Sequence, residues 1–143
     1  MREILFRGKR ADNGEWTTGT PFFVKDRCKM IHAVAVHPDF LCEGNVYYSE
    51  GYPVIPDTIG EYTGLTDKNG KKIFEGDIVH MNSKKFGLSG HGVVVYRNGG
   101  FAIYDRKRNR LYPFMQNGQY NAGDYRVVGN IHDHKELLHD SKV

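Results

Sequence analysis

The stretch Gly92-Val93-Val94-Val95-Tyr96-Arg97-Asn98-Gly99-Gly100-Phe101-Ala102-Ile103-Tyr104-Asp105 decides the fold class of this sequence. Its two arms are rich in β-branched and aromatic residues, which fit a pleated strand and lose rotamer freedom in a helix. Between the arms, Asn98-Gly99-Gly100 accepts the positive φ angles that a tight hairpin turn requires. The stretch therefore predicts a β-hairpin with arms from Gly92 to Arg97 and from Phe101 to Asp105.

The composition of the 143 residues extends this prediction to the whole chain. Valine and isoleucine number 20 and aromatic residues 18, whereas alanine and leucine together number only 12. The 17 glycines, about 12% of the chain against an average near 7%, indicate many tight turns. We therefore expect an all-β protein of short strands with one short C-terminal helical turn, and not a helix bundle.

Further strands are predicted on both sides of the central hairpin. Residues 3–24 read as a hairpin that turns at Asn13-Gly14, and residues 29–37 and 125–131 read as single strands. Residues 82–92 hold several glycines and serines and two lysines, which predicts a polar loop.

Two subdomains are expected, with a soft boundary near residues 56–62. Residues 1–60 would form an N-terminal β-hairpin and meander, and residues 61–143 a C-terminal subdomain. In the second, Glu75-Gly76-Asp77 leads into a strand ahead of the glycine-valine hairpin. That order is common in small SH3-like barrels, so we expect such a barrel there by analogy of fold alone.

Charge and apolar patterning exclude some classes of protein. The net charge of +3 is too small to indicate nucleic-acid binding by itself. The longest apolar run, Val93 to Tyr96, is far shorter than the roughly 20 residues that a membrane-spanning helix needs. The N-terminus has too short an apolar stretch for a signal peptide, and two cysteines are too few for a disulfide scaffold. We expect a cytoplasmic protein with reduced thiols and no membrane contact.

The charge is nevertheless unevenly distributed. Residues 72–143 carry 11 basic and 7 acidic residues, and the excess is concentrated in Arg106 to Arg110. Arginines neutralise phosphates, and aromatic side chains stack on unpaired bases. The sequence therefore offers a candidate nucleic-acid site on one hairpin, made of Arg97, Tyr104, Arg106, Lys107, Arg108, Arg110 and Tyr112. The alternative is a solvated basic turn whose neighbouring aromatic residues lie in the core.

Two clusters have the residue types of metal sites. Cys28, His32, His37 and Cys42 suit zinc, but the two histidines would project from opposite faces of one strand. His132, Asp133, His134 and His139 also form a group, but Asp133 and Glu136 fit a helix capping box better. We therefore expect no metal ion. Gly64 to Lys71 does not have the spacing of a phosphate-binding loop, so no cofactor or small-molecule substrate is expected, and no catalytic residues are assigned.

Three stretches of the sequence carry a family resemblance: a long one from Val54 to Val79, one at the start from Arg2 to Arg10, and one at the end from Val127 to Asp133. They resemble the YopX family, which is found largely in phages and prophages of bacteria. The resemblance implies a mainly β fold and a bacterial host cell, and it implies no known reaction. Its glycine and aspartate positions are expected to be structural: Gly60, Gly64, Asp67, Gly70, Gly76, Asp77 and Gly129.

Three hypotheses of function follow. The first is a non-enzymatic phage or prophage accessory protein, a β-rich interaction module that self-associates because exposed strand edges must be paired or covered. The second is a nucleic-acid-binding protein acting through the hairpin at residues 96–112. The third is an enzyme, which the sequence supports least because it shows no convergent set of polar residues.

Overall fold

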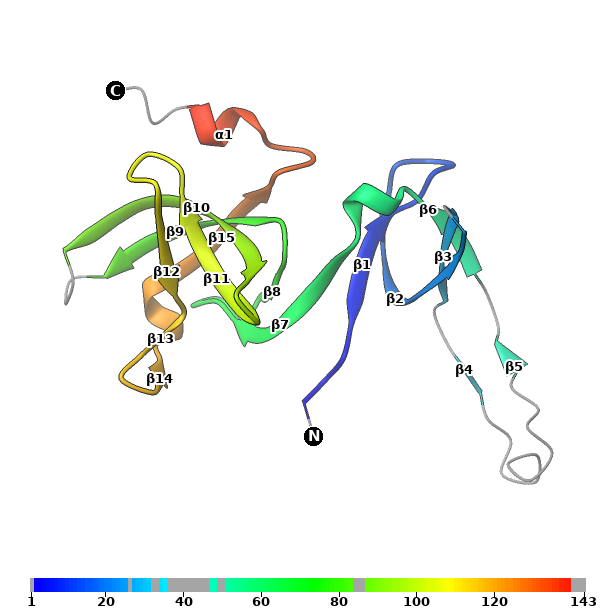
Figure 1. Ribbon diagram of the computed structural model, residues 1–143, viewed down its shortest axis with the longest axis horizontal. Helices are drawn as coiled ribbons and strands as arrows, with labels where there is room; N and C mark the ends of the chain where they lie inside the picture. Colours follow the sequence, from blue (N-terminus) through cyan, green and yellow to red (C-terminus); the bar gives the residue numbers. More distant parts are fainter. Residues whose placement is uncertain are drawn as a thin grey trace. The chain divides into compact units, whose positions relative to one another are not determined.

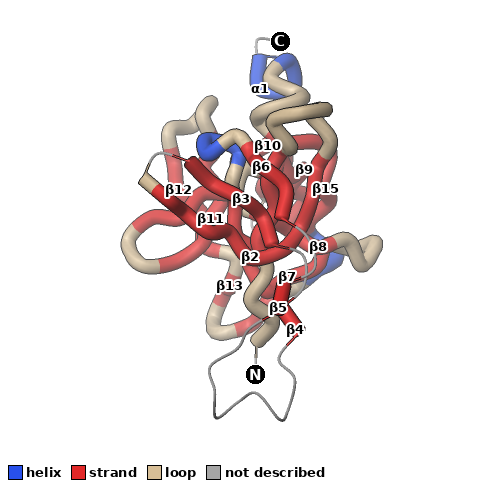
Figure 2. Tube along the Cα trace, turned by 90° about the vertical axis from the view of Figure 1, so that its right-hand side faces the viewer, coloured by secondary structure: helices blue, strands red, loops and turns tan. Residues whose placement is uncertain are grey.

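The computed structural model describes residues 2–25, 27–31, 34–35, 47–48, 51–83 and 87–139. Within these ranges the elements are almost all strands, and the helical segments are about one turn long (Figure 2). The predicted all-β fold with a short C-terminal helical turn, α1 (Glu136–His139), is therefore confirmed. No helix in the described residues is long and apolar enough to cross a membrane.

The chain divides into two compact units, one formed by Glu3–Glu61 and the other mainly by the residues from Tyr62 onward. In the first unit, antiparallel strands lie in the order β6-β3-β2-β1-β7. Their bounds are β1 (Phe6–Lys9), β2 (Trp16–Val24), β3 (Arg27–Ile31), β6 (Gly51–Val54) and β7 (Gly60–Thr66), with a 3-10 turn η2 (Pro56–Thr58) before β7. Two further short strands, β4 (Val34–Ala35) and β5 (Tyr47–Tyr48), pair with each other.

The hairpin predicted within residues 3–24 is formed by β1 and β2. Strand β2 pairs with β1 up to Gly19 and with β3 from Thr20 onward, so the ladder changes partner next to Pro21. A small core of Cys28, Met30 and Val54 lies beneath these strands. The strand predicted at residues 29–37 is found only in part, as β3 and β4, and its remaining residues lie outside the described ranges.

The second unit contains a five-stranded antiparallel sheet in the order β12-β11-β10-β9-β15 (Figure 1). Its strands are β9 (Asp77–Ser83), β10 (Leu88–Arg97), β11 (Gly100–Asp105), β12 (Arg110–Pro113) and β15 (Tyr125–Asn130). Strand β8 (Lys72–Phe74) pairs with the end of β7. A small hairpin of β13 (Met115–Gln116) and β14 (Gln119–Tyr120), then a 3-10 turn η3 (Ala122–Asp124), lead into β15.

The hairpin that opened the sequence analysis is formed by β10 and β11. Asn98 and Gly99 have φ angles of 55° and 80°, as a two-residue type I′ turn requires. Gly100 already belongs to β11 and pairs with Arg97, so the turn is one residue shorter than predicted.

The loop predicted at residues 82–92 is wrong, because β9 continues to Ser83 and β10 begins at Leu88. The glycine and polar residues of this stretch are typical of a loop, and they made the strand difficult to recognise from the sequence. A Cβ atom at Gly92 would lie 2.3 Å from Cγ2 of Ile103, so the glycine lets β10 pack closely against the core. The polar residues Ser89 and His91 pair with Asn82 and His80 across the ladder.

One face of this sheet covers the core of the second unit. The core residues are Ile73, Val79, Met81, Val94, Ile103, Phe114 and Tyr125. Since side chains alternate along a strand, His80 and Asn82 of β9 project from the opposite face, which we call the outer face. The outer face carries His80, His91 and Arg126 in one register row, next to the buried apolar pair Ile78 and Val93.

Two buried aspartates fasten the loops of this unit. Asp77 accepts a hydrogen bond from the backbone N of Phe74 at 2.8 Å. Asp67 accepts from the backbone N atoms of Asn69, Lys71 and Val127, each at 2.9 Å. Burial raises the pKa of the Asp67 carboxyl, but these backbone donors outweigh burial and leave the pKa below its usual value.

Candidate nucleic-acid interface

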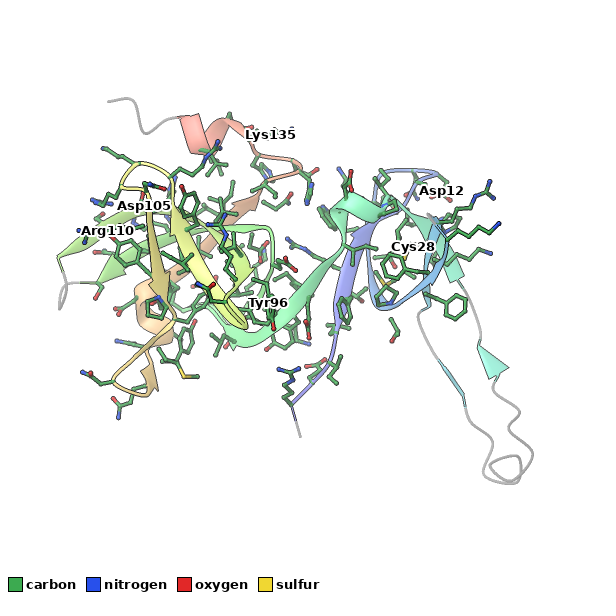
Figure 3. The ribbon with its side chains drawn as sticks, in the orientation of Figure 1. Asp12, Cys28, Tyr96, Asp105, Arg110 and Lys135 are labelled. Atoms are coloured by element: carbon green, nitrogen blue, oxygen red, sulfur yellow. The ribbon has the colours of Figure 1, made fainter. Side chains whose placement is uncertain are left out.

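The basic turn between β11 and β12 is organised by Asp105. The Asp105 carboxylate is buried and accepts from the backbone N atoms of Lys107, at 3.0 Å, and Arg108, at 3.2 Å. It also accepts from Nη1 of Arg108 at 2.6 Å, and this hydrogen bond raises the pKa of the guanidinium. The turn thus has a defined conformation in which Arg106 and Lys107 remain exposed. Figure 3 shows Asp105 and Arg110 at the end of the hairpin that faces α1, with Tyr96 at the other end.

A row of basic and imidazole side chains crosses the sheet beside this turn. His80 of β9 is the register partner of His91 in β10 and of Arg126 in β15. Register partners in neighbouring strands lie on the same face, about 4.8 Å apart along the row. The rings of His80 and His91 meet edge to face, with centroids 5.4 Å apart.

Two hollows of the outer face share His80. The first, of about 240 Å³, lies between β9, β10, the basic turn and α1, and its walls include His80, His91, Arg106, Lys107, Arg108 and Leu137. The second, of about 250 Å³, lies on the β15 side, and its walls include Lys68, His80, Asn82, Asp124 and Arg126. The two hollows have His80 in common, and we call their basic and imidazole side chains the basic strip: Lys68, Arg126, His80, His91, Arg106, Lys107 and Arg108.

The basic strip has an excess of positive charge. Five lysine and arginine side chains line the two hollows, against the two carboxylates Asp105 and Asp124. Asp105 is already paired with Arg108. Burial lowers the pKa of His80, and the positive fields of His91, Arg126 and Lys68 lower it further. The strip therefore disfavours a proton on the His80 ring and attracts anions.

The ring of His91 is oriented by the C-terminal helical turn. Its Nδ1 lies 3.4 Å from the backbone O of Leu137. Because a carbonyl oxygen can only accept, this contact is a hydrogen bond when the proton is on Nδ1. In that tautomer Nε2 carries the acceptor lone pair of the ring.

The site residues predicted from the sequence do not form a single surface. Arg106, Lys107 and Arg108 line the first hollow, whereas Arg110, although exposed, does not. Tyr112 pairs with Ile103 and packs against the core.

The side chain of Tyr104 already has two partners within the protein. The guanidinium of Arg97 lies over its ring, 4.7 Å from the centroid, and its hydroxyl donates to Oδ1 of Asn109. The basic and aromatic residues that the sequence predicts on one surface therefore lie on two different faces of the hairpin.

The sequence reasoning missed Lys68, His80, His91 and Arg126. His80, His91 and Arg126 are far apart in the chain and come together through the register of β9 with β10 and β15. Lys68 joins them because its backbone N donates to the backbone O of Tyr125 at 3.0 Å. Polar residues recur at every second position, as His80 and Asn82 and as Ser89 and His91. This period of two is the sequence signal that could have indicated a polar strand face.

Among the described residues, neither candidate metal cluster has the geometry of a metal site. Cys28 is buried, and burial raises the pKa of its thiol, while His32, His37 and Cys42 lie outside the described residues. In the tail, Nδ1 of His134 accepts from the backbone N of Asn130, and Asp133 accepts from Nδ2 of Asn130. Helix α1 begins at Glu136, so Glu136 stands at its first position and not at the third position that a capping box requires.

The comparisons with known proteins agree with this fold. The sequence matches the family model described as "YopX protein" over residues 5–139. The crystal structure of protein EF1440 from Enterococcus faecalis is similar, with a TM-score of 0.63 and 26% sequence identity over 96% of this chain and 99% of that chain. No curated protein sequence matches the chain.

Proposed function

The chain belongs to the YopX family, and we propose that its second unit is a non-enzymatic module that binds nucleic acid through the basic strip. The observation that carries the proposal is the register row of Arg126, His80 and His91, which joins the two basic hollows into one path across the sheet. A nucleic-acid backbone is a regular polyanion, and an extended row of cations is the surface that suits it.

The surroundings of the strip favour contacts to phosphate over contacts to bases. Tyr125 lines the second hollow, but it is buried and its ring is stacked on Tyr120, 5.5 Å between centroids. Tyr104 is covered by Arg97. With these rings occupied, the strip offers charge and hydrogen-bond donors, which recognise a backbone without reading its sequence.

The fold supports the same proposal. The meander β9-β10-β11-β12 is followed by the 3-10 turn η3, and β15 then returns to pair with β9. This strand order is typical of an SH3-like barrel, and we assign the second unit to that fold class. Such barrels serve many functions, so the fold alone does not select one. We further propose that the protein is of phage or prophage origin and acts in the cytoplasm of a bacterial host, as expected from the family resemblance.

The direct test is binding of a fluorescently labelled 20-mer of thymidylate at low salt, followed by anisotropy. Combined replacement of Arg106, Lys107 and Arg126 by alanine should lower the affinity at least tenfold, since each contributes a phosphate contact. The matched control replaces Lys25, Arg27 and Lys29, three exposed basic residues of the other unit, and should leave the affinity near the wild-type value. Absence of binding by the wild-type protein at low salt contradicts the proposal.

The non-enzymatic part of the proposal has its own test. A pair of histidines beside arginines has the residue types of an acid-base centre, so cleavage is the activity to examine. We expect end-labelled RNA and single-stranded DNA to be recovered intact after prolonged incubation with the protein. Cleavage that disappears in the variant His80→Gln would show an enzyme instead.

Self-association is a second proposal, favoured by exposed apolar side chains on β2. Phe22 and Phe23 are 56% and 58% exposed, and large exposed apolar surface is typical of protein–protein contact sites. Light scattering should show a mass that increases with concentration, and replacing both residues by serine should restore a monomer. Replacement of Met115, which is 55% exposed in the other unit, is the control. A wild-type monomer at high concentration contradicts this proposal.

A further inference from the structure

The first hollow has the features of a single phosphate subsite within the basic strip. It gathers three cationic side chains of the turn with two imidazoles, and its remaining described walls include the apolar Leu137 and Leu138 of α1. The histidine rings touch each other edge to face, and the row continues to Arg126 on the far side of His80. A group bound here would therefore meet cations on one side and both histidines on the other.

We propose that one phosphate group of the bound strand lies in the first hollow, between the histidine pair and the turn formed by Arg106 to Arg108, and that the pair takes up one proton from solvent as the phosphate binds. The inference rests on the proposed function, because the phosphate is that of a nucleic-acid backbone. The phosphodiester keeps its single negative charge, and a neutral imidazole becomes an imidazolium that donates to it.

The charges around the pair give the reason for this coupling. His80 faces His91 from β10, Arg126 from β15 and Lys68 from the turn after β7, and all of these disfavour a proton on its ring. The carboxylates that line the two hollows are Asp105, which accepts from Arg108 and two backbone amides, and Asp124 in the second hollow. The described part of α1 adds only leucines to the walls of the first hollow. A bound phosphate adds a negative charge beside the two imidazoles, and so favours the protonated pair.

The test is the pH dependence of binding to the thymidylate 20-mer, whose bases do not titrate between pH 5.5 and 8. For the wild-type protein the affinity should rise as the pH falls, by up to about tenfold per pH unit for one proton taken up. The double variant His80→Gln, His91→Gln should lose the pH dependence, so that its affinities at pH 6 and pH 8 are equal. His132→Gln, which changes a histidine outside both hollows, should keep it.

A second measurement on the unaltered protein keeps the result independent of how the variants fold. Calorimetric titration at pH 6.5 in two buffers of different ionisation enthalpy should show net proton uptake on binding. Inorganic phosphate at the same total phosphate concentration should compete weakly, since it occupies the subsite without the rest of the strip.

Each outcome bears on one of the two claims. Binding without proton uptake, or pH dependence that persists in the double variant, overturns this inference and leaves the proposed function standing. Equal competition by inorganic phosphate shows a site for free anions and overturns the assignment to a strand. Absence of binding at every pH overturns the proposed function, and the inference with it.

Discussion

Asp67 accepts a hydrogen bond from the backbone N of Val127 through Oδ2 at 2.9 Å, across sixty residues of sequence. Its other oxygen accepts from the backbone N atoms of Asn69 and Lys71. One buried carboxylate thus closes the turn after β7 and fastens that turn to β15. Because this turn carries Lys68 and β15 carries Arg126, the same contact sets the second hollow of the basic strip.

Replacement of Asp67 by alanine should destabilise the protein by about 3 kcal/mol, because it leaves several backbone N–H groups without their acceptor. Asp67→Asn should cost about half as much, since its remaining oxygen can still accept within the turn while its amide group opposes the N–H of Val127. Urea unfolding measures both values. Asp12→Ala, which removes an exposed carboxylate paired with Arg10, is the control and should show no measurable change. Equal losses for alanine and asparagine would contradict the role assigned to Val127.

The stability contributed by Asp67 should depend on pH. Its pKa is lower in the folded protein than the ordinary value near 3.9, so the contribution is complete above that value. It is lost as the pH falls from about 4 through the folded pKa, because the unfolded chain then binds the proton more readily. Thermal unfolding of wild type and Asp67→Asn between pH 6 and 2.5 should show a difference in Tm that narrows below pH 4. A constant difference over this range argues against an ionised Asp67.

His80 should give a pH dependence in a higher range. Its pKa in the folded protein is below the ordinary value near 6.5, so its stabilising contribution is complete above that value and is lost as the pH falls through the folded pKa. His80→Gln should therefore reduce the loss of stability of the free protein between pH 7 and 5. Chemical denaturation at half-unit intervals of pH measures this, and parallel curves for both proteins would contradict it.

Gly92 should tolerate no side chain. Its alanine variant should be destabilised by about 1 to 3 kcal/mol, because the new Cβ atom would overlap Ile103, 2.3 Å away, in a filled core. Gly100→Ala, in the same hairpin, has no heavy atom within 4 Å of the new Cβ atom and should unfold at nearly the wild-type urea concentration. If the two variants are equally stable, β10 does not pack against the core as closely as described.

The central hairpin and the all-β class could be predicted from sequence because their signals are local. Asn98-Gly99 favours one turn type, and the flanking valines favour strands irrespective of their partners. The strand from Leu88 to Gly92 could not be predicted, because Gly92 allows a close contact with Ile103 that only the folded sheet reveals.

The candidate site shows the same limit. Arg106 to Arg108 stood out as a run, so the sequence could indicate the basic turn. His80 acquires meaning only from its register with His91 and Arg126, and register is set by long-range pairing. Tyr112 is a candidate site residue in the sequence, but alternation along β12 puts it on the core face, where it is the register partner of Ile103.

The salt dependence of binding tests the central claim most directly. For the thymidylate 20-mer, log K decreases with log salt, and the magnitude of that slope should decrease by about 0.7 for each phosphate contact removed. The double variant Lys68→Ala, Arg126→Ala should therefore reduce the magnitude by about 1.4. Lys25→Ala, Arg27→Ala removes the same charge from the other unit and should leave the slope unchanged. A slope for Lys68→Ala, Arg126→Ala that equals that of wild type, or one that falls equally in the control, would contradict binding along the basic strip.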